Sequence, residues 1–141
     1  MIDIETLGTK PDAVVLTVGG VKFDPYNSEE PHTPFSVRLD IDEQTAAGRV
    51  IDPNTIEWWG QQDKAIQDEA FSDENRTPVM TFIADLNKWL VGTDLKWAQG
   101  SRFDYGILED LIENSFKQHK NWAFWQEADS RTLGQLVPRD M

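Results

Sequence analysis

The stretch IDIETLG, residues 2–8, predicts a β-strand with two chemically different faces. Successive side chains on a strand point to opposite sides, so Ile2 and Ile4 share one face while Asp3 and Glu5 share the other. Burying an unpaired carboxylate is costly, and the two acids are therefore expected to converge on the polar face. An edge strand with a solvated face would produce the same pattern, and both alternatives stay open from this stretch alone.

Two further strand patterns follow within the first 40 residues. Residues 13–24, AVVLTVGGVKFD, alternate apolar and polar side chains, and Gly19-Gly20 marks a bulge or bend. Residues 35–40, FSVRLD, alternate in the same way. Counted with an opening strand over 1–5, these segments predict three consecutive antiparallel strands with short connections.

The apolar period then changes from that of strands to that of helices. Pro53 suits the first turn of a helix, and Thr77-Pro78 is typical of a capping residue followed by a proline. The expected elements are helices over 53–62, 63–71, 78–91 and 103–116, strands over 95–100 and 122–125, and a helix start over 132–137. This order predicts one α/β domain with a mixed five-stranded sheet flanked by helices.

Composition restricts the classes of function. The 141 residues include no cysteine, which excludes disulfides and thiolate zinc sites and fits a reducing compartment. No apolar run approaches the roughly 18 residues of a membrane helix, so we expect a cytoplasmic protein without a membrane partner. The formal net charge of -12 opposes a broad attraction to phosphates and suggests an acidic DNA mimic as one hypothesis. Bound divalent cations would weaken that objection to a nucleic-acid partner.

Asp104 is the third acid of interest. Ile107, Leu108 and Leu111 follow it at three, four and seven residues, so Asp104 lies on the buried side of its predicted helix, in the first turn. A capping role would also place an acid there. If Asp104 meets the two acids of the first strand, the three carboxylates repel one another unless cations lie between them. Hard oxygen donors suit Mg²⁺ or Mn²⁺.

Three motifs carry a resemblance to a known family: DIETLG at residues 3–8, WAQGSRFDYGIL at 97–108 and DSRTL at 129–133. With IDPNTIEWWGQQ and AFSDENRTP between them, the chain resembles the DEDD family of 3′-to-5′ exonucleases. It is most similar to the small phage and prophage-type members of the DEDDh branch, related to ribonuclease T and to polymerase proofreading subunits. The resemblance covers nearly the whole chain and implies the ribonuclease H-like fold.

The resemblance also implies roles for individual residues. Asp3, Glu5 and Asp104 match the catalytic ligands of two divalent cations, Mg²⁺ or Mn²⁺, with Asp3 as the bridging ligand. Asp129 and Arg131 match positions that support these ligands. The residues expected to contact substrate are Thr6, Leu7, Gly8, Gln99, Gly100 and Trp59. A tight turn over 6–8 is the alternative for the first three.

No motif assigns a role to the remaining aromatic, arginine and histidine residues. Trp58 and Trp59 are adjacent and cannot face one direction on a helix, so one of them is expected to be exposed, and we assign Trp59 to the substrate groove. Arg49, Arg102 and Arg131 could contact phosphates or face solvent. His32 and His119 are expected to be ordinary surface histidines.

One departure from the family pattern matters. The family has a fourth aspartate on a late helix, five residues after a histidine or four after a tyrosine, and neither motif follows residues 129–133. We therefore expect a single exonuclease domain over 1–141 that is truncated before its C-terminal helix.

The favoured function is hydrolysis of phosphodiester bonds at single-stranded 3′ ends, DNA before RNA, with release of nucleoside monophosphates. A homodimer is one expectation, because ribonuclease T-like relatives are often dimers. The alternatives are a catalytically inactive module that binds nucleic acid or protein on the same fold, and the acidic DNA mimic.

Overall fold

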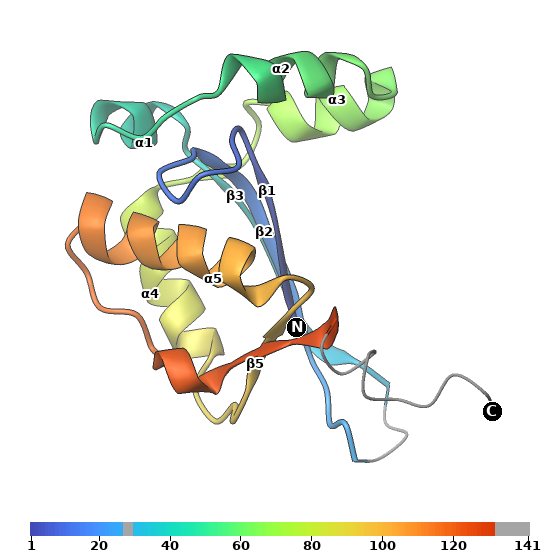
Figure 1. Ribbon diagram of the computed structural model, residues 1–141, viewed down its shortest axis with the longest axis vertical. Coiled ribbons are helices and arrows are strands. Elements are labelled where there is room, and N and C mark those ends of the chain that lie inside the picture. Colours follow the sequence, from blue (N-terminus) through green and yellow to red (C-terminus); the bar gives the residue numbers. More distant parts are fainter. Residues whose placement is uncertain (27–29, 132–141) are drawn as a thin grey trace.

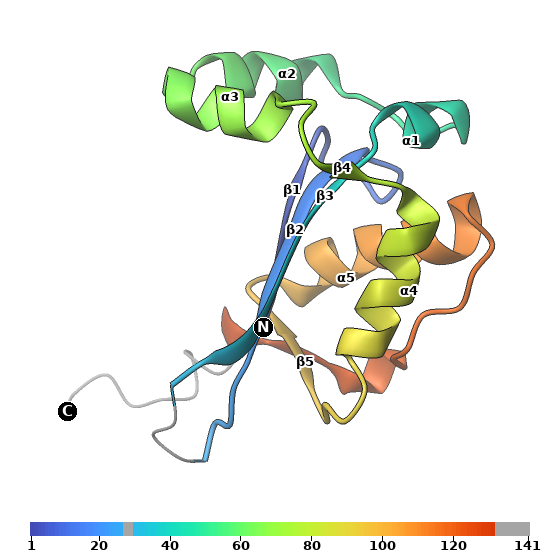
Figure 2. The same cartoon turned by 180° about the vertical axis from the view of Figure 1, so that it is seen from behind.

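The computed structural model of the protein describes residues 1–26 and 30–131. Its strands are β1 (Ile2–Thr6), β2 (Val15–Lys22), β3 (His32–Leu39), β4 (Arg76–Thr77), β5 (Lys96–Ala98) and β6 (Glu127–Asp129). Its α-helices are α1 (Asp42–Ala46), α2 (Pro53–Gly60), α3 (Lys64–Phe71), α4 (Val79–Trp89) and α5 (Ser101–Glu109). A π-helical turn, η1 (Asp110–Ser115), continues α5, and a 3₁₀ turn, η2 (Phe124–Gln126), precedes β6. Helices α4 and α5 cover one face of the sheet, and α2 and α3 lie beyond one end of β1 and β2 (Figures 1 and 2).

The main sheet has the strand order β1-β2-β3-β4. Strands β1, β2 and β3 are antiparallel neighbours, which confirms the predicted arrangement of the first three strands. The pairing of β2 with β3 shifts register between Gly20 and Lys22, so the predicted irregularity at the glycines is also confirmed. A Cβ atom on Gly20 would lie 2.8 Å from the Trp89 ring, and this contact requires a glycine. The short strand β4 was not predicted, since two residues show no period.

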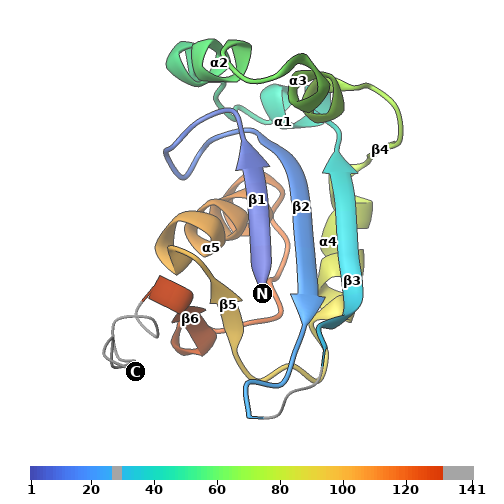
Figure 3. The same ribbon diagram turned by 90° about the vertical axis from the view of Figure 1, so that its right-hand side faces the viewer.

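The predicted single five-stranded sheet is wrong. Within the described residues, β5 and β6 form a separate two-stranded parallel sheet, although β5 lies beside β1 (Figure 3). At the edge of β1 that faces β5, the Ile4 N–H interacts with the carboxylate of Asp104 and lowers its pKa.

Two helix starts illustrate what local patterns can predict. Helix α2 begins at Pro53 as expected, and the Asp52 side chain caps it by accepting from Asn54 N at 2.9 Å. The cap predicted at Thr77 is wrong, because Thr77 belongs to β4. The Val79 N–H at the start of α4 instead donates to Glu43 Oε2 at 2.9 Å.

The C-terminal part of the described chain also differs from expectation. The strand predicted over 122–125 is wrong, since the chain forms η2 there and β6 begins at Glu127. The Ala123 N–H donates to Gln126 Oε1 at 2.9 Å, a local bond that favours a turn over an extended strand. The helix start predicted over 132–137 lies outside the described residues.

Two buried clusters hold the elements together. The larger lies between the sheet and the helices α4 and α5, and it includes Ile2, Ile4, Phe82, Leu86, Ile107, Leu108 and Leu111. The smaller joins β1 and β2 to α2 and α3 through Leu7, Val14, Leu16, Trp59 and Ala70. Among the helices described, none has the length and apolar character needed to span a membrane.

Candidate active site

The polar face of β1 opens away from α4 and α5. Asp3 and Glu5 are exposed, whereas Ile2 and Ile4, which alternate with them along the strand, are buried, and this confirms the predicted separation of the two faces. The register extends this face over the neighbouring strands. Asp3 pairs with Gly19, which pairs with Ser36, and Glu5 pairs with Thr17, which pairs with Arg38.

A cavity of about 200 Å³ lies over these two rows. Its lining includes Asp3, Glu5, Arg38 and, from α3, Glu69. Partial burial raises the pKa of Glu5, and the negative charges of Asp3 and Glu69 add to this effect, while the Arg38 guanidinium opposes it. The Arg38 side chain also donates to the backbone oxygen of Glu69.

Asp104 reaches β1 from the other layer. It lies in the first turn of α5 and is only 4% exposed, so its predicted place on the buried side of the helix is confirmed. Burial raises the pKa of Asp104 to about 7, and the negative charge of Asp3 is the next largest cause. The Ile4 N–H and the Arg131 guanidinium act in the opposite direction. Asp104 and Asp3 therefore interact across the edge of β1.

The turn between β5 and α5 positions Asp104. Gly100 has φ of +78°, a left-handed conformation that favours glycine, and Gln99 before it is exposed. The Asp129 carboxylate accepts hydrogen bonds from Gly100 N at 3.1 Å, Ser101 N at 3.3 Å and Arg131 N at 2.9 Å. These bonds lower the pKa of Asp129. Asp129 thereby joins β6 to the start of α5.

The donor chemistry of the site is suited to hard cations. The negative charge of Asp3 repels the carboxylates of Glu5 and Asp104, and this repulsion contributes to the raised pKa of both. A bound cation would offset the repulsion. Within residues 1–26 and 30–131, however, no group of three or more His, Cys, Asp or Glu residues is gathered closely enough to hold a metal ion. The negative charge of Asp3 raises the pKa of Glu5 and of Asp104, but the three acids do not form one such group.

The turn after β1 does not present the surface expected for substrate. The Leu7 side chain is only 2% exposed, and its N–H donates to Val14 O at 2.8 Å. The Thr6 hydroxyl donates to Gly8 O at 2.6 Å, and all three residues are buried. The substrate contact expected of the Leu7 side chain is therefore wrong, because this side chain belongs to the smaller core cluster, and the alternative of a tight turn describes the segment.

The two adjacent tryptophans exchange the roles assigned to them. Trp59 is 6% exposed and donates from Nε1 to Thr6 O at 3.0 Å, whereas Trp58 is 52% exposed. The assignment of Trp59 to the substrate groove is therefore wrong, since its ring fills the core beneath α2. The expectation that one of the pair is exposed is confirmed, with Trp58 as that residue.

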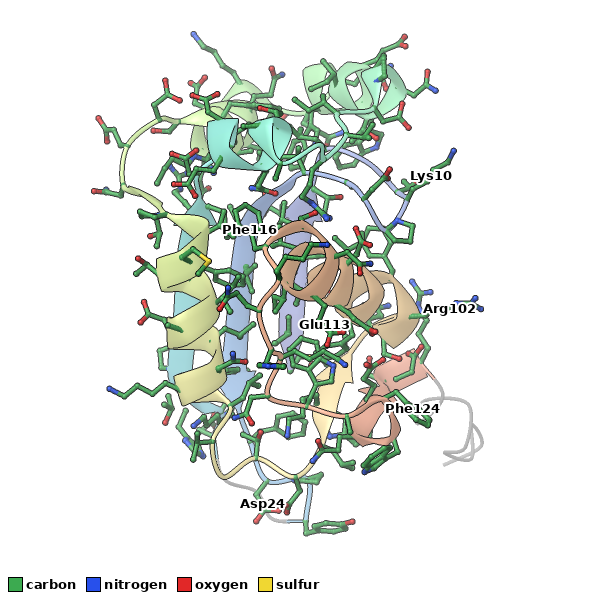
Figure 4. All side chains as sticks on the ribbon, turned by 90° about the vertical axis from the view of Figure 1, so that its left-hand side faces the viewer. Lys10, Asp24, Arg102, Glu113, Phe116 and Phe124 are labelled. Carbon is green, nitrogen blue, oxygen red and sulfur yellow. The ribbon has the colours of Figure 1, made fainter. Side chains whose placement is uncertain are left out.

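Three of the described arginines differ in their environments. Arg49 is 5% exposed and forms an ion pair with Asp110 at 2.8 Å, so a phosphate contact there is wrong. Arg102 is exposed and projects away from α5 (Figure 4). Arg38, beside Glu5, was missed as a site residue. The polar half of the FSVRLD alternation was the available signal, but choosing Arg38 required the register of β3.

The mixed sheet with interacting carboxylates on β1 and α5 is consistent with an α/β nuclease. The chain belongs to the 3′-5′ exoribonuclease Rv2179c-like domain family, whose model matches residues 1–141. It is also 30% identical over 168 aligned residues to the exodeoxyribonuclease of Enterobacteria phage T4, an alignment that covers 100% of this chain and 73% of that protein. Both similarities support a 3′-5′ exonuclease activity.

Proposed function

We propose that this chain is a DEDD-type 3′-5′ exonuclease on the ribonuclease H-like fold, which hydrolyses phosphodiester bonds at single-stranded 3′ ends and releases nucleoside monophosphates. The observation that carries the proposal is the electrostatic interaction of Asp3 with both Glu5 and Asp104. The pKa values of Glu5 and Asp104 are raised, and acids with raised pKa values are typical of catalytic sites. The match of the whole chain to an exonuclease family gives this cluster its chemical context.

In this proposal Asp3, Glu5 and Asp104 hold two divalent cations, Mg²⁺ or Mn²⁺. Such ions, when bound, supply activation of a water and stabilisation of the leaving 3′ oxygen. Asp104 is held at the edge of β1 by the hydrogen bond from Ile4 N, and Asp129 fixes the start of the helix that carries it. The acids thus arrive on two rigid elements, as a preorganised site requires.

Arg38 is the residue that we propose for the phosphate of the substrate. It lines the same cavity as Asp3 and Glu5, and a guanidinium offers a planar fork of donors that matches phosphate oxygens. A local cation at this position also answers the objection that the net charge of -12 raises against a nucleic-acid substrate.

Trp58 is our proposed stacking surface for a terminal base. Its ring packs edge-on against Trp59 with 5.0 Å between centroids, and Trp59 donates to the backbone of Thr6, next to Glu5. The exposed ring therefore lies near the end of β1 that carries Glu5. Base stacking on such a ring tolerates any sequence, as an exonuclease needs.

Digestion of 5′-labelled single strands tests the proposal. DNA and RNA of one sequence are incubated with the chain and Mg²⁺ or Mn²⁺, and the expected result is a ladder shortened from the 3′ end, with DNA degraded faster. Asp3→Asn should give no ladder, while the exposed control Asp85→Asn on α4 should retain it. Absence of shortened products from both DNA and RNA would refute the proposed exonuclease activity.

A catalytically inactive binding module is the second candidate. The observation that favours it is the lack, among the described residues, of a group of three or more acids or histidines able to hold a metal ion. It predicts that the chain binds the labelled strand in a gel-shift assay without shortening it. The acidic DNA mimic predicts neither cleavage nor any effect of Asp3→Asn. A homodimer and a cytoplasmic location stay predictions, and light scattering tests the first.

A further inference from the structure

A second cavity, of about 760 Å³, lies away from the carboxylate face. It is bordered by the end of β2, the end of α4 and the connection from α4 into β5, and it shares no lining residue with the cavity over Asp3 and Glu5. Its volume falls within the range of roughly 300 to 1,000 Å³ typical of small-molecule sites. The function proposed above does not use it.

Aromatic rings form part of its lining. Phe23 and Trp97 pack against each other as a tilted pair, with 6.3 Å between their ring centroids, and Trp89 of α4 contributes a third ring to the lining. All three are only half-buried, so part of each ring stays accessible. Such faces suit a planar ring, because stacking needs contact area more than hydrogen bonds.

The same cavity is lined by two lysines, Lys22 and Lys96, and by two aspartates, Asp24 and Asp94. Lys96 is only 4% exposed, and its Nζ donates to Thr93 O at 2.8 Å. Burial lowers the pKa of Lys96, and the nearby charge of Asp94 offsets only part of this effect. Lys22 lies with its Nζ 5.4 Å from the centre of the Trp89 ring. A buried ammonium is costly unless an anion compensates it.

We propose that this cavity binds a nucleotide, with the base against Trp97 and Phe23 and the phosphate against Lys96 and Lys22. The rings alone would suit any planar molecule, and the lysines alone would suit any small anion. A nucleotide combines both features in one ligand. The ligand is either a free nucleoside monophosphate or one nucleotide unit of a strand. This binding needs neither metal nor turnover, so it stands apart from the exonuclease.

Calorimetric titration of the whole chain in EDTA tests the proposal. The probes are deoxyadenosine monophosphate, deoxyadenosine, inorganic phosphate and a short oligodeoxyadenylate. We expect the monophosphate to bind at least about tenfold more tightly than the nucleoside or phosphate alone, because only it makes both contacts. Tighter binding of the oligonucleotide than of the monophosphate would assign the site to a strand, and the reverse to a free nucleotide.

Variants of lining residues test whether the nucleotide binds in this cavity. Lys96→Met and Trp97→Leu should each weaken it about tenfold, whereas the exposed Trp125→Leu on η2 and Asp3→Asn should not change it. Lys22→Met serves as an independent test if the buried Lys96→Met variant fails to fold. The proposal is overturned if no probe binds, if phosphate alone binds as tightly as the nucleotide, or if Asp3→Asn abolishes binding. Since the titration contains no metal and no cleavable product is scored, its failure would leave the exonuclease proposal intact.

Discussion

Replacing Asp104 by asparagine should stabilise the metal-free protein at alkaline pH. The asparagine retains an oxygen that can accept from Ile4 N and is nearly the same size as the aspartate, but it carries no charge. Burial and the neighbouring charge of Asp3 both disfavour the ionised carboxylate in the folded state. The substitution therefore removes an unfavourable charge without removing the hydrogen bond.

The sign and size of the effect follow from the pKa. Folding raises the pKa of Asp104 from 3.8 to about 7, so the folded wild type favours the neutral acid and loses stability as the pH rises from about 4 to about 7. Each pKa unit corresponds to about 1.4 kcal/mol, which gives an upper limit of about 4 kcal/mol above pH 7. We expect Asp104→Asn to raise the free energy of unfolding by about 2 to 4 kcal/mol at pH 8 and by little at pH 4.

Urea unfolding followed by tryptophan fluorescence measures this difference in EDTA at several pH values. Asp85→Asn on α4 is the matched control, because Asp85 is exposed and lies outside the site. Its unfolding free energy should differ little from wild type at any pH. A gain for Asp104→Asn that is the same at both ends of the pH range, or a loss of stability at pH 8, would refute the reasoning.

Three further variants test other parts of the structure. Asp3→Asn should reduce cleavage at least about 100-fold while leaving the circular dichroism spectrum unchanged, and full activity would contradict its role. Arg49→Met removes the ion pair with Asp110 and the hydrogen bonds to Pro11 O and Ala13 O, and it should lower the unfolding free energy by about 3 kcal/mol in urea; a neutral result would contradict a stabilising role for the buried Arg49. Gly100→Ala should cost about 1 to 2 kcal/mol because of its φ of +78°, whereas Gly60→Ala, with open space around it in α2, should not destabilise.

The parts of the fold that were predictable depend on neighbours in sequence. The alternation in IDIET fixed the two faces of β1, and the apolar residues after Asp104 fixed its burial, since both patterns repeat over a few residues. The parts that failed depend on contacts between distant segments. The start of α4 is capped by Glu43, 36 residues away, and Arg49 pairs with Asp110. A hydrophobic pattern that repeats over a few residues cannot reveal contacts between segments so far apart in the chain.

The exposed tryptophan shows the same limit within the site. Helix α2 carries apolar side chains at Ile56, Trp58 and Trp59, and these do not define a single stripe. The hydrogen bond from Trp59 to Thr6 O decides which ring is buried. That bond joins α2 to the end of β1, so the rotation of the helix was set by tertiary structure, and the sequence predicted only that the two rings would differ.

The environments of the acids separate those that stabilise the fold from those that we assign to chemistry. Asp110 is paired with Arg49, and Asp129 accepts three backbone N–H bonds that lower its pKa. Asp104 also receives a backbone N–H, yet burial and Asp3 outweigh it and raise its pKa. A fold gains nothing from placing Asp3 beside Asp104 without a compensating cation. Residues that oppose stability in this way are expected at functional sites, and this contrast is our reason for locating the proposed hydrolysis at β1 and the first turn of α5.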